Sequence, residues 1–214
     1  MKKLLQKINN LKLNTKFTLL ITFCAMLPIG VFAGIYFWYM EETTVQEDIS
    51  STQYTMERNK DAFSSRVDSL NMTTQFFMTD ELLISVLDKT AENKLVSTQE
   101  WLDLKNDDIS HLERLVTNNP ILYGVRVYAV NENVQEMMPI LYKNSRMQKL
   151  EWAQKENYEG WNFDYDDNIF ASYSLQQNKK IVSLVTTLKN RKGAVIGTIE
   201  TATTMSDMFP SLYE

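Results

Sequence analysis

The clearest structural signal in this chain is a pair of extended runs, Lys180-Ile-Val-Ser-Leu-Val-Thr-Thr-Leu-Lys189 and Gly193-Ala-Val-Ile-Gly-Thr-Ile-Glu-Thr-Ala202. Both runs have the apolar and β-branched composition that is typical of strands. The residues between them, 190–193, are Asn-Arg-Lys-Gly, a turn-forming sequence. We therefore predict a β-hairpin, after which Thr203 or Thr204 caps a short final helix.

Three further extended segments lie upstream of this hairpin. A period of two predicts a strand at 121–130, a weaker strand follows at 137–142, and a third extended run covers 168–176. Because adjacent strands pair readily, these segments predict a mostly antiparallel sheet of about five strands with helices against one face. This arrangement is an α+β fold.

Two helical patterns accompany the strands. The first begins at Ser97 or Thr98, which are good capping residues, and stops at Asn118-Asn119-Pro120. The second covers about 147–158 and ends before Gly160. We expect both helices to pack against the predicted sheet.

The region 41–89 contains neither proline nor glycine, which predicts one long helix. Apolar residues recur on it at seven-residue intervals and form a stripe that consists of Ile49, Met56, Phe63, Leu70 and Phe77. The stripe has two interpretations: the helix packs along its own domain, or it contacts a second copy in a parallel homodimer. The candidate dimer contacts are Ile49, Met56, Phe63 and Leu70. Polar residues three positions further on argue against a strong coiled-coil seam.

Residues 17–40 carry no charge, and the tail before them, 1–16, has five lysines and no acid. About 20 helical residues cross a bilayer, so we predict a transmembrane helix at 17–40, with a cleaved signal peptide as the alternative. The lysines place the tail in the cytoplasm. The predicted order is a cytoplasmic tail (1–16), a transmembrane helix (17–40) that contacts the lipid bilayer of the cell membrane, a long helical stalk (41–89) and an extracytoplasmic domain (90–214).

Composition excludes several kinds of chemistry. After residue 16 the chain has 17 basic and 27 acidic residues, a net charge of −10, which argues against nucleic acid as a partner. With one cysteine, Cys24, and one histidine, His111, it can assemble neither a Cys/His metal site nor a histidine-dependent triad. Asp164, Asp166 and Asp167 lack the spacing of a calcium loop and are expected to form a solvated turn. We expect no cofactor, no metal and no catalytic residue.

The order of elements resembles the N-terminal part of bacterial membrane sensor histidine kinases that carry a Cache-type, PAS-like extracytoplasmic sensor domain. The segment Ile121-Leu-Tyr-Gly-Val-Arg-Val-Tyr128 is similar to the first Cache strand. The hairpin 180–201 is similar to the paired strands that end in a Gly-hydrophobic-hydrophobic-Gly arm in that family. The resemblance implies that 90–214 is a Cache/PAS-like sensor domain with an antiparallel sheet of about five strands.

The resemblance also implies a function. The domain would bind a small-molecule ligand or an extracellular binding protein and pass a signal through the transmembrane helix to a histidine kinase core. That core would lie outside this chain, since the sequence stops at Glu214 without a second membrane helix. The chain also lacks the Arg-x-Trp-Tyr segment of amino-acid-binding Cache domains, so an amino-acid ligand is unsupported.

Aromatic side chains between the second and third predicted strands suggest where a ligand would bind. In PAS-like folds the sheet and this connecting segment wall the ligand pocket, and aromatic faces with a few polar groups suit small organic ligands. The candidate ligand-binding residues are Arg126, Tyr128, Trp152, Tyr158 and Trp161. The alternative is that the rings only cover the core.

Two other functions fit the same sequence features. The chain could be a membrane-anchored, non-enzymatic binding or assembly protein. It could also be the input domain of a chemoreceptor or of a cyclic-dinucleotide enzyme. The sequence favours the histidine kinase input module through the resemblance above.

Overall fold

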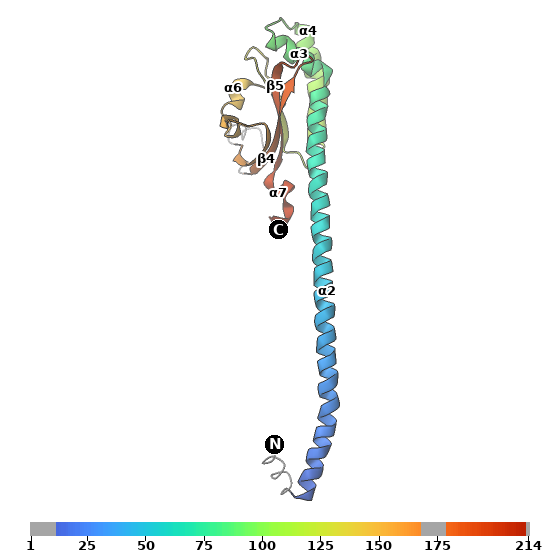
Figure 1. The fold of residues 1–214 in the computed structure, drawn as a ribbon. Helices are drawn as coiled ribbons and strands as arrows, with labels where there is room; N and C mark the ends of the chain where they lie inside the picture. The colour runs from blue at the N-terminus through green and yellow to red at the C-terminus, as the bar shows by residue number, and fades with distance from the viewer. Residues whose placement is uncertain (1–11, 168–178, 213–214) are drawn as a thin grey trace. The chain divides into compact units, whose positions relative to one another are not determined.

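The computed structural model describes residues 12–167 and 179–212 (Figure 1). The predicted extended run at 168–176 lies outside these residues. The chain divides into two units, one up to Arg58 and one from Asn59 onward, and each is described by itself.

The first unit consists of the N-terminal part of α2 (Leu13–Thr79), a 67-residue α-helix. This part contains an 18-residue window that is apolar and none of which is buried inside the protein. By length and composition the helix could therefore cross a membrane as an anchor, and a signal sequence would have the same properties.

Helix α2 ends earlier than the sequence pattern predicts. In place of one helix over 41–89, the chain forms α2 up to Thr79 and then α3 (Glu81–Ala91). Asp80 between them has extended backbone, and its carboxylate accepts a hydrogen bond of 2.9 Å from the backbone N–H of Leu83. Aspartate competes well for this N-cap position, so a single residue starts a new helix without any proline or glycine.

The helix predicted from Ser97 to Asn119 is confirmed, with one irregular turn. It comprises α4 (Thr98–Asp103), a π-helical turn η1 (Leu104–Ile109) and α5 (Ser110–Thr117). Ser97 and Glu100 form a reciprocal capping box at its start.

The second unit contains a five-stranded sheet in the order β2-β1-β5-β4-β3, which confirms the α+β fold. The strands are β1 (Gly124–Ala129), β2 (Leu141–Lys143), β3 (Gly160–Asp166), β4 (Lys180–Lys189) and β5 (Val195–Thr204). The β4–β5 hairpin is confirmed, and Thr204 caps α7 (Met205–Met208) by accepting from the N–H of Asp207. The short 3-10 turn η4 (Pro210–Leu212) follows.

The sheet is mixed: the predicted mostly antiparallel pairing holds for three of its four strand pairs, and the fourth pair is parallel. Strand β2 runs parallel to β1, although β1–β5, β5–β4 and β4–β3 are antiparallel. The chain reverses direction a second time just before β2, where Met137 and Leu141 exchange two backbone hydrogen bonds. This extra reversal returns β2 to the direction of β1.

The segment before β4 also differs from the prediction. The helix expected at 147–158 is reduced to α6 (Asn144–Met147) and the 3-10 turn η2 (Trp152–Gln154). Strand β3 forms from the aromatic segment that follows, starting at Gly160, whose φ of +104° favours glycine. Alternation of side chains along β3 then places Trp161 and Asn162 on opposite faces of the sheet.

Helices cover the two faces of this sheet unequally. The end of α2, α3 and α4 lie on one face, and α6 lies on the other (Figure 1). The helix-side core includes Phe77, Leu83, Leu104, Val127 and Ile199. The opposite face carries a mainly aromatic cluster, which includes Tyr128, Tyr142, Trp152, Tyr165 and Val185.

A carboxyl group on the π-helical turn faces the junction between α2 and α3. Burial raises the pKa of Asp108 to about 6 from an ordinary value of 3.8, and the neighbouring carboxylates of Asp80 and Asp107 add to the shift. The folded state binds the proton of Asp108 more tightly than the unfolded chain does. Protonation of Asp108 therefore contributes stability to the folded state, and this contribution is fully present below about pH 4. It is lost as the pH rises through about 6.

We predict that Asp108→Asn stabilises the protein at neutral pH, because the amide cannot acquire the unfavourable charge. The gain should be about 1 kcal/mol at pH 7.5, a value reduced for solvent screening because the side chain is only partly buried. It should vanish near pH 4. Urea unfolding followed by tryptophan fluorescence at both pH values measures it. The exposed control Glu113→Gln should change stability little at either pH, and an equal gain at pH 4 and 7.5 would contradict the assignment.

Candidate functional site

A carboxylate is buried in the middle of the sheet. Glu200 on β5 is fully inaccessible to solvent. It lies directly across from Arg126 on β1 and from Val185 on β4, which are its partners in the strand register. Since partners across strands share a face, Glu200 and Arg126 both lie on the aromatic face of the sheet.

Three uncharged donors surround Glu200. Tyr128 donates from Oη to Oε2 at 2.5 Å, while Tyr165 donates from Oη to Oε1 at 2.5 Å. Trp152 donates from Nε1 to Oε1 at 3.0 Å. The donors come from β1, β3 and η2, so one carboxylate joins two strands and a connecting turn to β5.

Arg126 links this carboxylate to a second one. Its Nη1 lies 3.4 Å from Glu200 Oε2, and its Nη2 donates to Asp167 Oδ2 at 2.6 Å. Tyr123 also donates from Oη to Asp167 Oδ2, at 2.7 Å, and its ring lies 5.9 Å from the guanidinium carbon. Asp167 Oδ1 is buried and finds no hydrogen-bond partner among the residues that the structure describes. We call Arg126, Tyr128, Trp152, Tyr165, Asp167 and Glu200 the Glu200 network.

Electrostatics keep the donors of this network protonated. Burial, followed by the charge of Glu200, raises the pKa of both Tyr128 and Tyr165 well above the ordinary value of 10.0. Burial alone would lower the pKa of Arg126, but the charges of Glu200 and Asp167 outweigh burial and hold it well above its ordinary range. All three side chains therefore remain hydrogen-bond donors throughout the physiological pH range.

The structure brings together three of the five predicted ligand-binding residues. Arg126, Tyr128 and Trp152 converge on Glu200, and Tyr158 packs its half-buried ring on Trp152 with 5.8 Å between centroids. Trp161 does not join them. It pairs with Leu184 on the helix-side face and stacks on Phe163 at 6.2 Å.

Sequence reasoning missed the residue at the centre. Glu200 is a single acid inside the run 196–204, which is buried throughout, and this isolation is the signal that could have identified it. The three acids of the predicted solvated turn also lie in different environments. Asp164 and Asp166 lie within 3.8 and 3.3 Å of the Lys180 ammonium, whereas Asp167 is buried in the Glu200 network.

The predicted dimer stripe on α2 changes its environment along the helix. Ile49 and Met56 are 56% and 67% exposed. Phe63 stacks on Phe209 with 5.5 Å between ring centroids, and Leu70 is fully buried in its own unit. Leu70 is therefore a core residue, and of the four candidates Ile49 and Met56 leave most of their surface open to a second chain.

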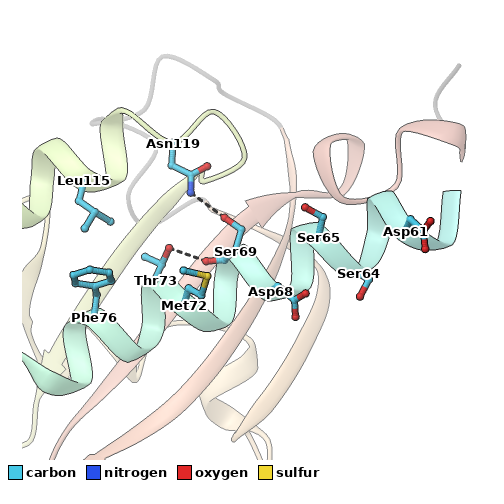
Figure 2. Close-up of a pocket in the computed structure, with 10 residues that line it drawn as sticks. All are labelled: Asp61, Ser64, Ser65, Asp68, Ser69, Met72, Thr73, Phe76, Leu115 and Asn119. Carbon is cyan, nitrogen blue, oxygen red and sulfur yellow. Dashed lines mark hydrogen bonds between the residues drawn. The ribbon is translucent and has the colours of Figure 1, made fainter. Parts of the chain in front are cut away.

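A shallow groove of about 570 Å³ runs along α2 on the helix side of the sheet (Figure 2). Hydroxyl groups dominate its polar lining, and Phe76 and Leu115 lie at one end. Asn119 donates from Nδ2 to Ser69 Oγ at 3.0 Å, which fastens α2 to the loop before β1. Within residues 12–167 and 179–212, no three His, Cys, Asp or Glu side chains gather as metal ligands.

Comparison of the chain with models of protein families, with curated proteins and with solved structures finds no match. Its function must therefore be argued from its own residues.

We predict that Glu200→Gln destabilises the protein by about 3 kcal/mol. Each carboxylate oxygen faces one partner that can only donate, Trp152 on one side and Arg126 on the other. The amide nitrogen of glutamine must therefore face one of them and leave a buried donor unpaired. Urea unfolding monitored by tryptophan fluorescence measures the loss. The exposed control Glu156→Gln should have almost no effect, and equal stabilities for the two variants would refute a central role for the network.

Proposed function

We propose that this chain is the extracytoplasmic sensory module of a membrane receptor of the two-component sensor histidine kinase type. In this proposal the α+β unit binds a small-molecule ligand or a ligand-loaded binding protein on the aromatic face of the sheet. The apolar part of α2 crosses the bilayer, with residues 1–16 in the cytoplasm. The signal travels from the sheet into α2.

A pair of adjacent residues on β5 carries this proposal. Glu200 points into the network on one face of the sheet, and Thr201 points to α2 on the other. The hydroxyl oxygens of Thr201 and Thr74 are 2.7 Å apart and buried. Because Thr74 also directs its hydroxyl to the carbonyl oxygen of Leu70 at 2.9 Å, we infer that Thr201 supplies the shared hydrogen.

This connection gives a route for a signal. A ligand that changes the Glu200 network alters the position of β5, and Thr201 transmits the change to a helix that is continuous with the apolar span. A small energy is sufficient, because a differential affinity of about 1.4 kcal/mol shifts a two-state equilibrium tenfold.

The receptor would act as a homodimer whose copies meet along α2. The exposed residues Ile49 and Met56 lie in a part of the helix that offers an apolar strip and few buried side chains. A long helix in water gains stability mainly from packing an apolar face, so a second copy is the natural partner. An anchored binding or assembly protein would need no link between sheet and span, and the Thr74–Thr201 contact therefore favours the sensor.

We predict that single cysteines placed on α2 cross-link in membranes where the helix is exposed. After Cys24→Ser removes the native thiol, Met56→Cys should form disulfide-linked dimers on mild oxidation. Leu70→Cys is the matched control on the same stripe, and its burial should keep it monomeric. Non-reducing gel electrophoresis measures both. Absence of dimers at position 56 would exclude a dimer through this face.

The same assay tests the signal route. Glu200→Gln in the Met56→Cys background should change the cross-linking yield about twofold or more. Adding Thr201→Val, which removes the hydroxyl, should abolish that change. Glu156→Gln serves as the control and should leave the yield unchanged. If Thr201→Val has no influence on the effect of Glu200→Gln, the sheet does not signal through this contact and the anchored binding protein becomes the better description.

A further inference from the structure

A second pocket lies between α2 and the C-terminal segment, away from the Glu200 network. Its volume is about 290 Å³, at the lower end of the range for small-molecule sites. Its lining comes from two parts of the chain, with Asn59, Lys60, Phe63 and Arg66 on α2 and Met208, Phe209, Pro210 and Ser211 after β5.

The charge of this pocket is opposite to that of the domain around it. Lys60 and Arg66 are its charged lining residues, and no acid lines it among the residues that the structure describes. The chain from residue 17 onward has a net charge of −10. Neither cation makes an ion pair or side-chain hydrogen bond within the described parts of the chain, although Arg66 is half-buried. A guanidinium that lines a pocket and has no partner among the described residues can pair with an anion through charge-assisted hydrogen bonds.

The opposite side of the pocket is apolar and aromatic. Phe63 and Phe209 stack with 5.5 Å between their centroids and 20° between their planes. Pro210 extends this surface, and Phe63 keeps 38% of its surface exposed. The pocket therefore combines two cations with an apolar wall.

We propose that this pocket binds an anion carried on an apolar body, such as a carboxylate or a phosphate ester attached to an aromatic or aliphatic group. Arg66 pairs with the anion through its planar donors, and Lys60 adds a second positive charge. The apolar body lies against the Phe63–Phe209 stack. Because the ligand touches both α2 and the segment after β5, it fastens the two together, and this site does not depend on the proposed sensory function.

The test uses the full chain in phosphatidylcholine nanodiscs with 4-fluorophenylacetate as the probe. Titration followed by ¹⁹F NMR should show saturable binding beyond that of empty nanodiscs. Arg66→Gln should weaken binding about tenfold, the effect expected for loss of one charge-assisted hydrogen bond. The matched control Arg58→Gln, on the same helix but outside the pocket, should bind like the wild type. Circular dichroism melting should show that all variants fold.

Two further measurements make the chemistry specific. The uncharged analogue 4-fluorophenylacetamide should bind about tenfold more weakly than the acid. Equal binding of the two compounds, or wild-type binding by a folded Arg66→Gln variant, would overturn the proposal. Nanodiscs that contain phosphatidylglycerol distinguish the source of the anion once the Arg66 dependence is established. Loss of the probe assigns the site to a lipid phosphate, and retained binding assigns it to a soluble anion.

Discussion

Glu200 places a carboxylate at the centre of the sheet, where water does not reach it, and this burial constrains the residues around it. An acceptor in such a place must be given donors from several directions. Two tyrosines, a tryptophan and an arginine supply them. They come from elements that are distant in the sequence, so the aromatic face can form only when β1, β3, β5 and η2 are all in place. Formation of the Glu200 network therefore requires that these four elements fold together.

Strand β5 connects the Glu200 network to the rest of the sheet, because it lies between β1 and β4. Near one end it lies so close to β1 that a Cβ on Gly197 would approach the Tyr128 carbonyl oxygen to 2.9 Å. Further along β5, the side chains of Glu200 and Thr201 point to opposite faces of the sheet. A central strand that is paired on both sides, with a polar network on one face and a helix contact on the other, can transmit a displacement more directly than an edge strand such as β2, which has one strand partner.

Local patterns in the sequence were sufficient for the elements whose signals are local. The β4–β5 hairpin, the capped helix beginning after Ser97 and the Thr204 cap all follow from composition and capping chemistry within a few residues. The parallel pairing of β2 and the set of side chains that reach Glu200 could not be obtained in this way. Whether Trp161 or Tyr165 reaches Glu200 depends on strand alternation and on the register shift between Asn162 and Tyr165. Neither the alternation nor the register shift can be predicted before the position of the strand is known.

The α2 stripe is buried within its own unit at Leu70 and Phe77 only, and the proposed dimer contact concerns its exposed part, Ile49 and Met56. An α-helix repeats every 3.6 residues, so residues spaced by seven drift about 20° around the axis with each repeat. Over the four repeats from Ile49 to Phe77 the stripe rotates by about 80°. Residues that share a spacing in the sequence therefore need not share a surface. Ile49 and Met56 face solvent, while Leu70 and Phe77 face the sheet of their own unit. A contact between copies and a contact within the chain can thus use successive segments of the same seven-residue pattern. The position of the sheet determines which residues of the pattern are buried within the chain.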